Sequence, residues 1–328
     1  MRAVVLGATG HIGAHVVRAL LEGGHTVRAT YRNPAYRFVL EGLPVEQRQA
    51  DLDDPAAVRQ AVDGCAWVFH CAAYYPKFTE RRDRAVERGL AQIARVYEVL
   101  ADTRPERVVY TSSAATIAPQ RDRPSTEADL EPWPLAHWRP LYATVKVAME
   151  YAVLRYADRG VAVTTVHPSL CLGEYDAHPF SGRLLLLLAR GLPVYLEHHF
   201  NAVYTGDVGV GHVLAAERGA PGAHYLLADR DISMRVLAEL VARQRGMRPP
   251  RWALPYPVAL AAAAATEVVA AVTGREPLLP LRAVQMTRHR QWVDGSRSRH
   301  ALGLPHTPLE DAIRRALKWF EAHGYLAS

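Results

Sequence analysis

The stretch Val5–Gly13, VLGATGHIG, decides the fold, because it joins an apolar run to a helical pattern through Gly7, Gly10 and Gly13. The run Ala3–Leu6 before it has the character of a strand, and apolar residues recur at helical spacing from Ile12 onwards. A strand that turns into a helix presents free backbone N–H groups and the positive helix end to an anion. Glycine permits the tight turn and the close approach of a phosphate. We therefore predict that this loop, Thr9 and His11 included, holds the pyrophosphate of a dinucleotide. A strand-to-helix turn without a ligand is the alternative.

The same alternation of strand and helix continues along the chain. Further strand patterns cover residues 26–32, 45–50, 66–73, 107–113 and 161–168, and long helical patterns cover residues 82–103 and 141–158. Short connections between such elements predict a parallel sheet with helices on both faces, and ligands of these sheets bind at the carboxyl ends of the strands. We predict a doubly wound α/β domain over residues 1–168, completed by part of 200–230. A smaller substrate-binding lobe is expected in residues 169–328, where 201–206 looks like a strand and 309–326 like an amphipathic helix.

Composition excludes several classes of protein. Of the 328 residues, 49% are hydrophobic and the net charge is +6, but the basic residues are interspersed and form no stripe for nucleic acid. The three cysteines have neither metal spacing nor a disulfide framework, and no export signal is visible, so we expect a cytoplasmic protein. The apolar stretch 253–274 contains two prolines and Glu267. We expect a buried or interface helix there and no stable membrane insertion.

The end of the second strand bears on the choice of cofactor. An NAD site usually places an acidic residue there to bind the ribose 2′-hydroxyl. The sequence has Thr30, Tyr31, Arg32 and Asn33 instead. The guanidinium of Arg32 can bind a 2′-phosphate, which favours NADP over NAD. A solvated surface arginine is the alternative.

The pair Tyr142 and Lys146 carries the candidate chemistry. Residues four apart share one face of a helix, so the phenol and the ammonium are expected to converge. A neighbouring cation favours the phenolate, and we expect Lys146 to lower the pKa of Tyr142. Ser113 is the last residue of the strand pattern 107–113, which ends at the same sheet edge, and its hydroxyl can polarise a substrate oxygen. The alternatives are a surface pair and a serine that caps the strand end.

In combination these motifs resemble one family. The glycine loop, HCAA at His70–Ala73, YTSSAA at Tyr110–Ala115, Tyr142-x-x-x-Lys146 and HPSLCLG at His167–Gly173 stand in the order and spacing of the extended short-chain dehydrogenases/reductases. Within that family the chain is most similar to dihydroflavonol reductase-like proteins and nucleoside-diphosphate-sugar epimerases.

The resemblance implies roles for particular residues. It assigns Asp51 and Leu52 to the adenine pocket, Ala72 and Ala73 to the cofactor ribose and phosphates, and Pro168 to the nicotinamide. It gives the catalytic roles to Ser113, Tyr142 and Lys146, the last two of which also contact the cofactor, and it implies a possible homodimer.

The chain also departs from the family pattern. The sequence AVERGL keeps Gly89 but lacks the usual asparagine, which leaves the support of the catalytic lysine open, and Val145 replaces a serine. Dehydratases of the family carry an Asp-Glu pair where this chain has Ala114 and Ala115, so dehydration is not expected.

Residues that contact the substrate are harder to predict. Tyr74, Tyr75 and Lys77 follow a strand, and Arg183 and Asn201 lie where related enzymes bind substrate. Simple packing or surface roles are the alternatives for these residues. The histidines have no ligand spacing, so no metal site is predicted.

The function predicted from the sequence is an NADP-dependent oxidoreductase. It would transfer a hydride between nicotinamide and a secondary alcohol or ketone carbon, as dihydroflavonol reductases do. A sugar-nucleotide epimerase with tightly bound NAD(P) is the first alternative, and a non-catalytic NADP sensor or scaffold is the second.

Overall fold

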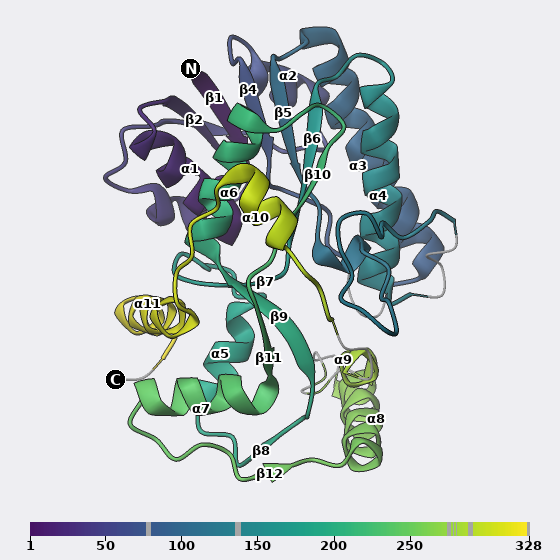
Figure 1. The fold of residues 1–328 in the computed structure, drawn as a ribbon, viewed down its shortest axis with the longest axis vertical. Helices are drawn as coiled ribbons and strands as arrows, with labels where there is room; N and C mark the ends of the chain where they lie inside the picture. Colours follow the sequence, from purple (N-terminus) through teal and green to yellow (C-terminus); the bar gives the residue numbers. More distant parts are fainter. Residues whose placement is uncertain are drawn as a thin grey trace.

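A seven-stranded parallel sheet forms the centre of the protein (Figure 1). The computed structural model describes residues 1–76, 80–134, 139–273, 277, 279, 281–287 and 291–326. The strand order is β10-β6-β5-β4-β1-β2-β3. The strands are β1 (Arg2–Leu6), β2 (Thr26–Tyr31), β3 (Glu46–Gln49), β4 (Trp67–His70), β5 (Arg107–Thr111), β6 (Val163–Pro168) and β10 (His224–Leu227). Since β1 is paired with both β2 and β4, the order reverses at the strand that leads into the glycine loop. Such a reversal is where ligands of doubly wound sheets bind.

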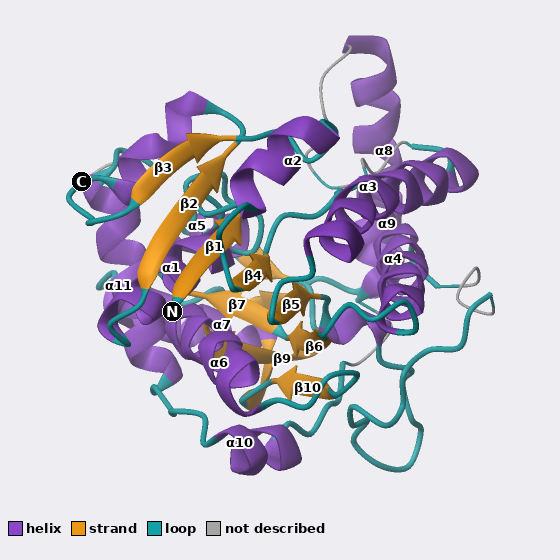
Figure 2. Cartoon of the chain, turned by 90° about the horizontal axis from the view of Figure 1, so that it is seen from above, coloured by secondary structure: helices purple, strands orange, loops and turns teal. Residues whose placement is uncertain are grey.

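Helices cover both faces of this sheet, as Figure 2 shows from above. One face carries α2 (Pro55–Val62), α3 (Arg82–Thr103) and α4 (Leu141–Ala157), and the other carries α1 (His11–Glu22) and α6 (Thr205–Arg218). Each face buries alternate residues of the same strands, as Val4 and Val5 show on β1. The predicted doubly wound α/β fold is confirmed.

The second half of the chain builds a smaller lobe below the sheet in Figure 1. Its core joins α5 (Gly182–Ala189), α7 (Met234–Gln244) and α11 (Leu309–Ala322) to a three-stranded sheet of order β11-β9-β7. The remaining strands are β7 (Leu170–Leu172), β8 (Val194–Tyr195), β9 (His199–Tyr204), β11 (Arg230–Ser233) and β12 (Trp252–Ala253). The remaining helices are η1 (Pro34–Leu40), η2 (Ala114–Thr116), α8 (Tyr256–Thr273), α9 (Leu281–Met286) and α10 (Ser296–Leu302). Strand β6 ends at Pro168, and α6 and β10, later in the chain, return to the large sheet.

Three element ends differ from the sequence expectation. The strand expected to end at Ser113 ends at Thr111, because Ser113 caps the 3₁₀ turn η2. The strand expected over 201–206 stops at Tyr204, where α6 begins. The last helix ends at Ala322 rather than at 326, since Gly324 has a φ of +74° that a helix cannot continue through.

Helix α8 is the apolar stretch for which the sequence suggested a buried or interface helix. Only part of it is covered, because Ala259 and Ala263 pack toward α9 while Val268 is 65% and Val272 is 83% exposed. The first alternative, a buried helix, is therefore wrong, and the second, an interface helix, stays a prediction. Among the described residues no helix is both long and apolar enough to cross a membrane.

The packing of α6 on α1 depends on Gly209. A Cβ at this position would lie 2.7 Å from the carbonyl carbon and 2.8 Å from the carbonyl oxygen of His15, which are backbone atoms that cannot rotate away. We predict that Gly209→Ala lowers the free energy of unfolding by roughly 3 kcal/mol. Chemical denaturation monitored by circular dichroism measures this change.

Gly211→Ala on the same helix is the matched control. Its Cβ would meet only the side chains of Leu304 and Leu227, at 3.0 and 3.1 Å, and these can shift. Equal destabilisation by the two substitutions would show that backbone contact between the helices is not what Gly209 provides.

Candidate active site

The glycine loop is held by contacts that leave no room for side chains. Gly7 has a φ of +87°, and a Cβ there would lie 2.7 Å from the Cβ of Ala72. A Cβ at Gly13 would lie 2.2 Å from the carbonyl oxygen of Gly7. The hydroxyl of Thr30 accepts a hydrogen bond of 3.0 Å from the Gly7 N–H and donates one of 3.1 Å to the Val5 carbonyl. The contacts with Ala72 and between Gly13 and Gly7, and the hydrogen bonds of Thr30, thus fix the conformation of the turn.

This cradle fits a pyrophosphate. Gly10 is the N-cap of α1, is exposed, and supplies no side-chain cap for the first helical N–H groups. Thr9 and Ile12 are half-buried beside it. The ring of His11 instead reaches the start of α6, with Nε2 2.9 Å from the Thr205 hydroxyl. The uncapped helix end lies at the reversal point of the sheet, which is the arrangement that binds dinucleotide phosphates.

The other predicted cofactor residues lie at the carboxyl ends of neighbouring strands. Arg32 is exposed directly after β2. Asp51 follows β3 and accepts a hydrogen bond of 3.1 Å from the Asp53 N–H. Among the rest, Leu52 and Pro168 are buried, and Ala72 and Ala73 are half-buried after β4.

Arg37 is a second cation at this edge that the sequence analysis missed. It lies on η1, which Asn33 caps by accepting a hydrogen bond of 3.0 Å from the Ala35 N–H. The Arg37 guanidinium carbon is 5.1 Å from the centre of the Tyr31 ring, and its Nε donates to Gln47 at 3.0 Å. The Asn-Pro pair after Arg32 was the available signal, because it predicts a turn that brings the next residues back toward the strand end.

Tyr142, Ser113 and Tyr75 meet at the sheet edge. The Tyr142 hydroxyl forms hydrogen bonds with Ser113 and Tyr75. Its ring stacks on that of Tyr75, with centroids 5.5 Å apart. The Ser113 hydroxyl also accepts a hydrogen bond of 3.2 Å from the Ala115 N–H. Ser113 therefore both caps the turn and contacts Tyr142.

The electrostatics of Tyr142 correct one expectation. Burial raises the pKa of Tyr142, although its hydrogen bonds with Ser113 and Tyr75 act in the opposite direction. Lys146 was expected to lower this pKa, but its ammonium donates to the Thr111 carbonyl at 3.3 Å, and burial outweighs any effect of the cation on Tyr142. Lys146 is itself only 2% exposed, and burial lowers its pKa from 10.5 to about 8.

Helix α4, which carries this pair, is held against α3. Gly89 allows the close approach, since a Cβ there would lie 3.0 Å from the Met149 side chain and 3.1 Å from that of Val145. Val145, which replaces the family serine, thus belongs to the helix contact. Arg82 of α3 donates to the Arg139 carbonyl at 3.0 Å and to the Thr144 hydroxyl. These contacts support the start of α4 in a chain that lacks the usual asparagine.

Aromatic side chains form the open side of the site. Tyr75 is 49% exposed and Phe180 is 64% exposed, and their ring centroids are 5.2 Å apart. Phe180 also lies 6.3 Å from the Tyr142 ring. The sequence analysis missed Phe180, which precedes α5 and reaches the site only through the packing of the two lobes.

The other predicted substrate residues have different surroundings. The Tyr74 hydroxyl donates to Glu80. Arg183 is exposed on α5. Asn201 is buried on β9, where its amide donates to Asp231 and accepts from the Asp229 N–H, each at 3.0 Å. These bonds account for Asn201 without a ligand, and Lys77 lies outside the described residues.

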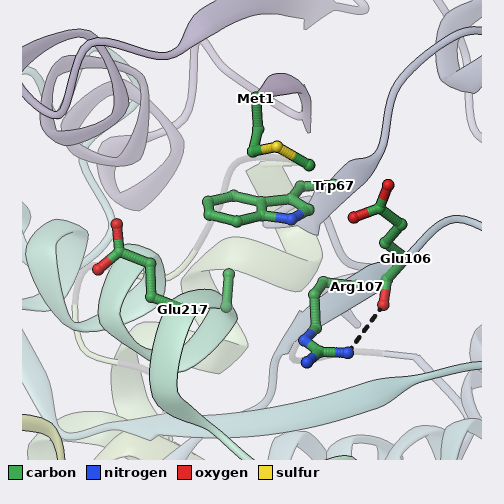
Figure 3. A pocket seen from close by; sticks show the side chains of 6 residues that line it. Met1, Trp67, Glu106, Arg107 and Glu217 are labelled. Atoms are coloured by element: carbon green, nitrogen blue, oxygen red, sulfur yellow. Dashed lines mark hydrogen bonds between the residues drawn. The ribbon is translucent and has the colours of Figure 1, made fainter.

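A separate hollow of about 430 Å³ lies at the opposite end of the sheet (Figure 3). Met1, Trp67 and Arg107, which line it, stand at the amino-terminal ends of β1, β4 and β5. Because ligands of open α/β sheets bind at the carboxyl ends, this hollow is not the site of the predicted chemistry.

Comparison with known proteins identifies the family. The model of the NAD dependent epimerase/dehydratase family matches residues 3–228, and the chain belongs to this family. It is therefore an NAD(P)-dependent reductase or epimerase of the extended short-chain dehydrogenase type, an enzyme of small-molecule substrates.

Individual relatives cover the whole chain. A Synechocystis protein with the provisional name dihydroflavonol 4-reductase is 31% identical over 328 residues, which are 98% of this chain and 95% of the relative. Sterol demethylase protein B of Methylococcus capsulatus is 30% identical over 334 residues, covering 99% of this chain and 100% of the relative. The crystal structure of a nucleoside-diphosphate-sugar epimerase from Pseudomonas aeruginosa is 26% identical with a TM-score of 0.81, and the match covers 100% and 99% of the two chains.

The buried Lys146 makes stability depend on pH. Its pKa is 10.5 when unfolded and about 8 when folded. Between these pH values the unfolded chain binds more protons, so stability rises with pH, while the cost of the buried charge is fully present below pH 8. Lys146→Met removes this contribution. We predict that the melting temperature of the variant minus that of the wild type falls between pH 7 and pH 10.

Differential scanning calorimetry at several pH values measures this difference. Lys318→Met, at an exposed position on α11, is the control and should give an offset that does not change with pH. A pH-independent offset for Lys146→Met as well would contradict the lowered pKa.

Proposed function

We propose that the protein is an NADP-dependent reductase that interconverts a secondary alcohol and a ketone on an aromatic or fused-ring small molecule. The observation that carries this proposal is the position of Tyr142 between Ser113 and the partly exposed rings of Tyr75 and Phe180. A flat apolar substrate can stack on these rings while its oxygen reaches the two hydroxyls.

The roles of the site residues follow from their contacts. Ser113 orients the substrate oxygen and polarises it by donating a hydrogen bond. Tyr142, whose raised pKa keeps the phenol protonated at neutral pH, donates the proton to the oxygen during ketone reduction and accepts it in the reverse direction. Lys146, at the same face of α4, binds the cofactor ribose. The nicotinamide, when bound, supplies or accepts the hydride.

Two relatives support an apolar substrate, since they are named for a dihydroflavonol and for a sterol. Sugar dehydration is not favoured, because Ala114 and Ala115 provide no carboxylate after Ser113. A sugar-nucleotide epimerase uses the same three catalytic side chains, and the likeness to the Pseudomonas structure keeps it as the second candidate. In that case the purified protein retains NAD tightly and epimerises a nucleoside-diphosphate sugar with no net oxidation of NADPH.

The preference for NADP is proposed from two arginines. Arg32 and Arg37 are exposed near the end of β2, where the 2′-phosphate of NADP would lie, and no acidic residue follows that strand. Arg37 is already oriented by Tyr31 and Gln47, so less side-chain freedom is lost when it binds an anion.

The first test of the mechanism is Tyr142→Phe. Loss of the proton donor should lower the turnover of a dihydroflavonol or another aromatic ketone by roughly 100-fold or more, with NADPH binding retained. NADPH oxidation followed at 340 nm (the absorption of the reduced nicotinamide) measures turnover. Tyr151→Phe, on the same helix, is the control and should keep wild-type turnover. Unchanged turnover of Tyr142→Phe would exclude the assigned role.

The second test addresses the cofactor. Arg32→Ala combined with Arg37→Ala should raise the Kd for NADPH by roughly 10- to 100-fold, because charged hydrogen bonds to the phosphate are lost, and should leave the Kd for NADH nearly unchanged. Isothermal titration calorimetry measures both constants. Arg235→Ala, exposed on α7, is the matched control. A wild-type protein that binds NADH as tightly as NADPH would favour the epimerase.

A further inference from the structure

Three side chains of types that ligate metal ions meet next to Ser112, the neighbour of Ser113 in the chain. Glu150 comes from α4, His167 from β6 and His224 from β10. Glu150 and His167 are fully buried, and the side chain of His224 is 23% exposed at the outer edge of the sheet. Figure 1 shows β6 and β10 side by side, with α4 on the same side of the molecule.

The distances in this cluster form an equilateral triangle. Glu150 Oε1 lies 3.3 Å from His167 Nε2 and 3.3 Å from His224 Nδ1. The two histidine nitrogens are also 3.3 Å apart. With bonds of about 2.0 to 2.1 Å, neighbouring ligands of a tetrahedral zinc ion lie about 3.3 Å apart. Hydrogen bonds between a charged histidine and a carboxylate are shorter, about 2.7 to 2.9 Å. The triangle therefore fits a shared cation better than direct hydrogen bonds.

The hydrogen bonds around His167 aim a lone pair into the cluster. The Thr116 hydroxyl donates to the Ser113 carbonyl at 2.8 Å, so its oxygen is left to accept from His167 Nδ1 at 3.0 Å. A neutral His167 protonated on Nδ1 directs the lone pair of Nε2 at the Glu150 carboxylate. Two acceptors that face each other in a buried site are unfavourable unless a cation lies between them.

The carboxylate is oriented in the same way. Glu150 Oε2 accepts a hydrogen bond of 2.6 Å from the Ser112 hydroxyl. Glu150 Oε1, on the cluster side, is buried and faces the two histidine nitrogens at 3.3 Å. Ligands of metal ions are commonly held by such outer hydrogen bonds, here from Ser112 to the carboxylate and from the histidine to Thr116.

The fourth position of the cluster is polar. The Thr165 hydroxyl lies 2.6 Å from His224 Nδ1 and 3.4 Å from His167 Nε2. At 2.6 Å the Thr165 hydroxyl is a hydrogen-bond partner of His224 Nδ1, and water can reach the exposed side of His224 to supply the fourth ligand. Two imidazoles, one carboxylate and an oxygen are a donor set that zinc accepts, whereas magnesium and calcium prefer oxygen alone.

We propose that Glu150, His167 and His224 bind one zinc ion that fastens the catalytic helix to the edge of the sheet. Glu150 lies one helical turn beyond Lys146 and two beyond Tyr142, on the same face of α4. A zinc ion at this position links the Tyr142–Lys146–Glu150 face of α4 to β6 and β10. Its role is to position the helix, because its ligands are not the catalytic side chains themselves. Sequence spacing predicted no metal, since the two histidines are 57 residues apart.

The test is zinc uptake by protein that carries no histidine tag. The protein is stripped with a chelator, dialysed to equilibrium against micromolar zinc sulfate, and analysed for metal by mass spectrometry. We expect one zinc per chain in the wild type and less than a tenth of that in His224→Asn. His199→Asn is the matched control, because His199 is 52% exposed on β9 and remote from the cluster. It should bind as much zinc as the wild type.

Zinc should also raise the melting temperature of the wild type and of His199→Asn but not that of His224→Asn, because a ligand stabilises only the state that binds it. Cobalt(II) provides a measurement on the wild type alone, since a tetrahedral site gives intense visible absorption. Equal zinc uptake by the wild type and His224→Asn, or weak octahedral cobalt spectra, would overturn the proposal. Either result leaves the proposed reductase activity untouched, because that activity is tested at Tyr142.

Discussion

The contact of Gly13 with the carbonyl oxygen of Gly7 is the constraint on which the rest of the site depends. Because no side chain separates them, α1 begins directly against the end of β1, and its uncapped N–H groups point to the place where the strand order reverses. Helix α6 packs against α1 through the close contact of Gly209 with the backbone of His15. Helix α6 leads into β10, which pairs with β6, so these two close backbone contacts connect the phosphate cradle with the far edge of the sheet.

Helix α4 also holds the site in place, and it buries several ionisable side chains along one face. Tyr142, Lys146 and Glu150 follow one face of it, and the last two are nearly or fully inaccessible to solvent. Burial of a charge is costly unless other groups compensate. For Lys146 the cost appears as a pKa of about 8. The fixed positions of these groups are what make the site suited to proton transfer, since donors that do not need to reorganise act most effectively.

Much of this architecture could be predicted from the residues. The glycine loop, the alternation of strand and helix and the Tyr142–Lys146 pair are local patterns, and each correctly predicted its element. The direction of the Tyr142 pKa was predicted wrongly, because a shared helix face says nothing about burial or about which acceptor the lysine finds. The helix of residues 256–273 was expected to be buried or to form an interface, but composition does not reveal which element covers it, and part of the helix is exposed.

The sequence by itself determined the fold class, the strand-to-helix turn at the glycine loop and the placement of Tyr142 and Lys146 on one helix, since these follow from the spacing of residues within single elements and from the geometry of strands and helices. Only the tertiary structure decided that Phe180 lies beside Tyr75 and Tyr142, that Arg37 returns to the end of β2, and that Glu150 meets His167 and His224. These groups come from segments far apart in the chain. Their contacts depend on how the lobes and the sheet edge pack, and no local pattern encodes that.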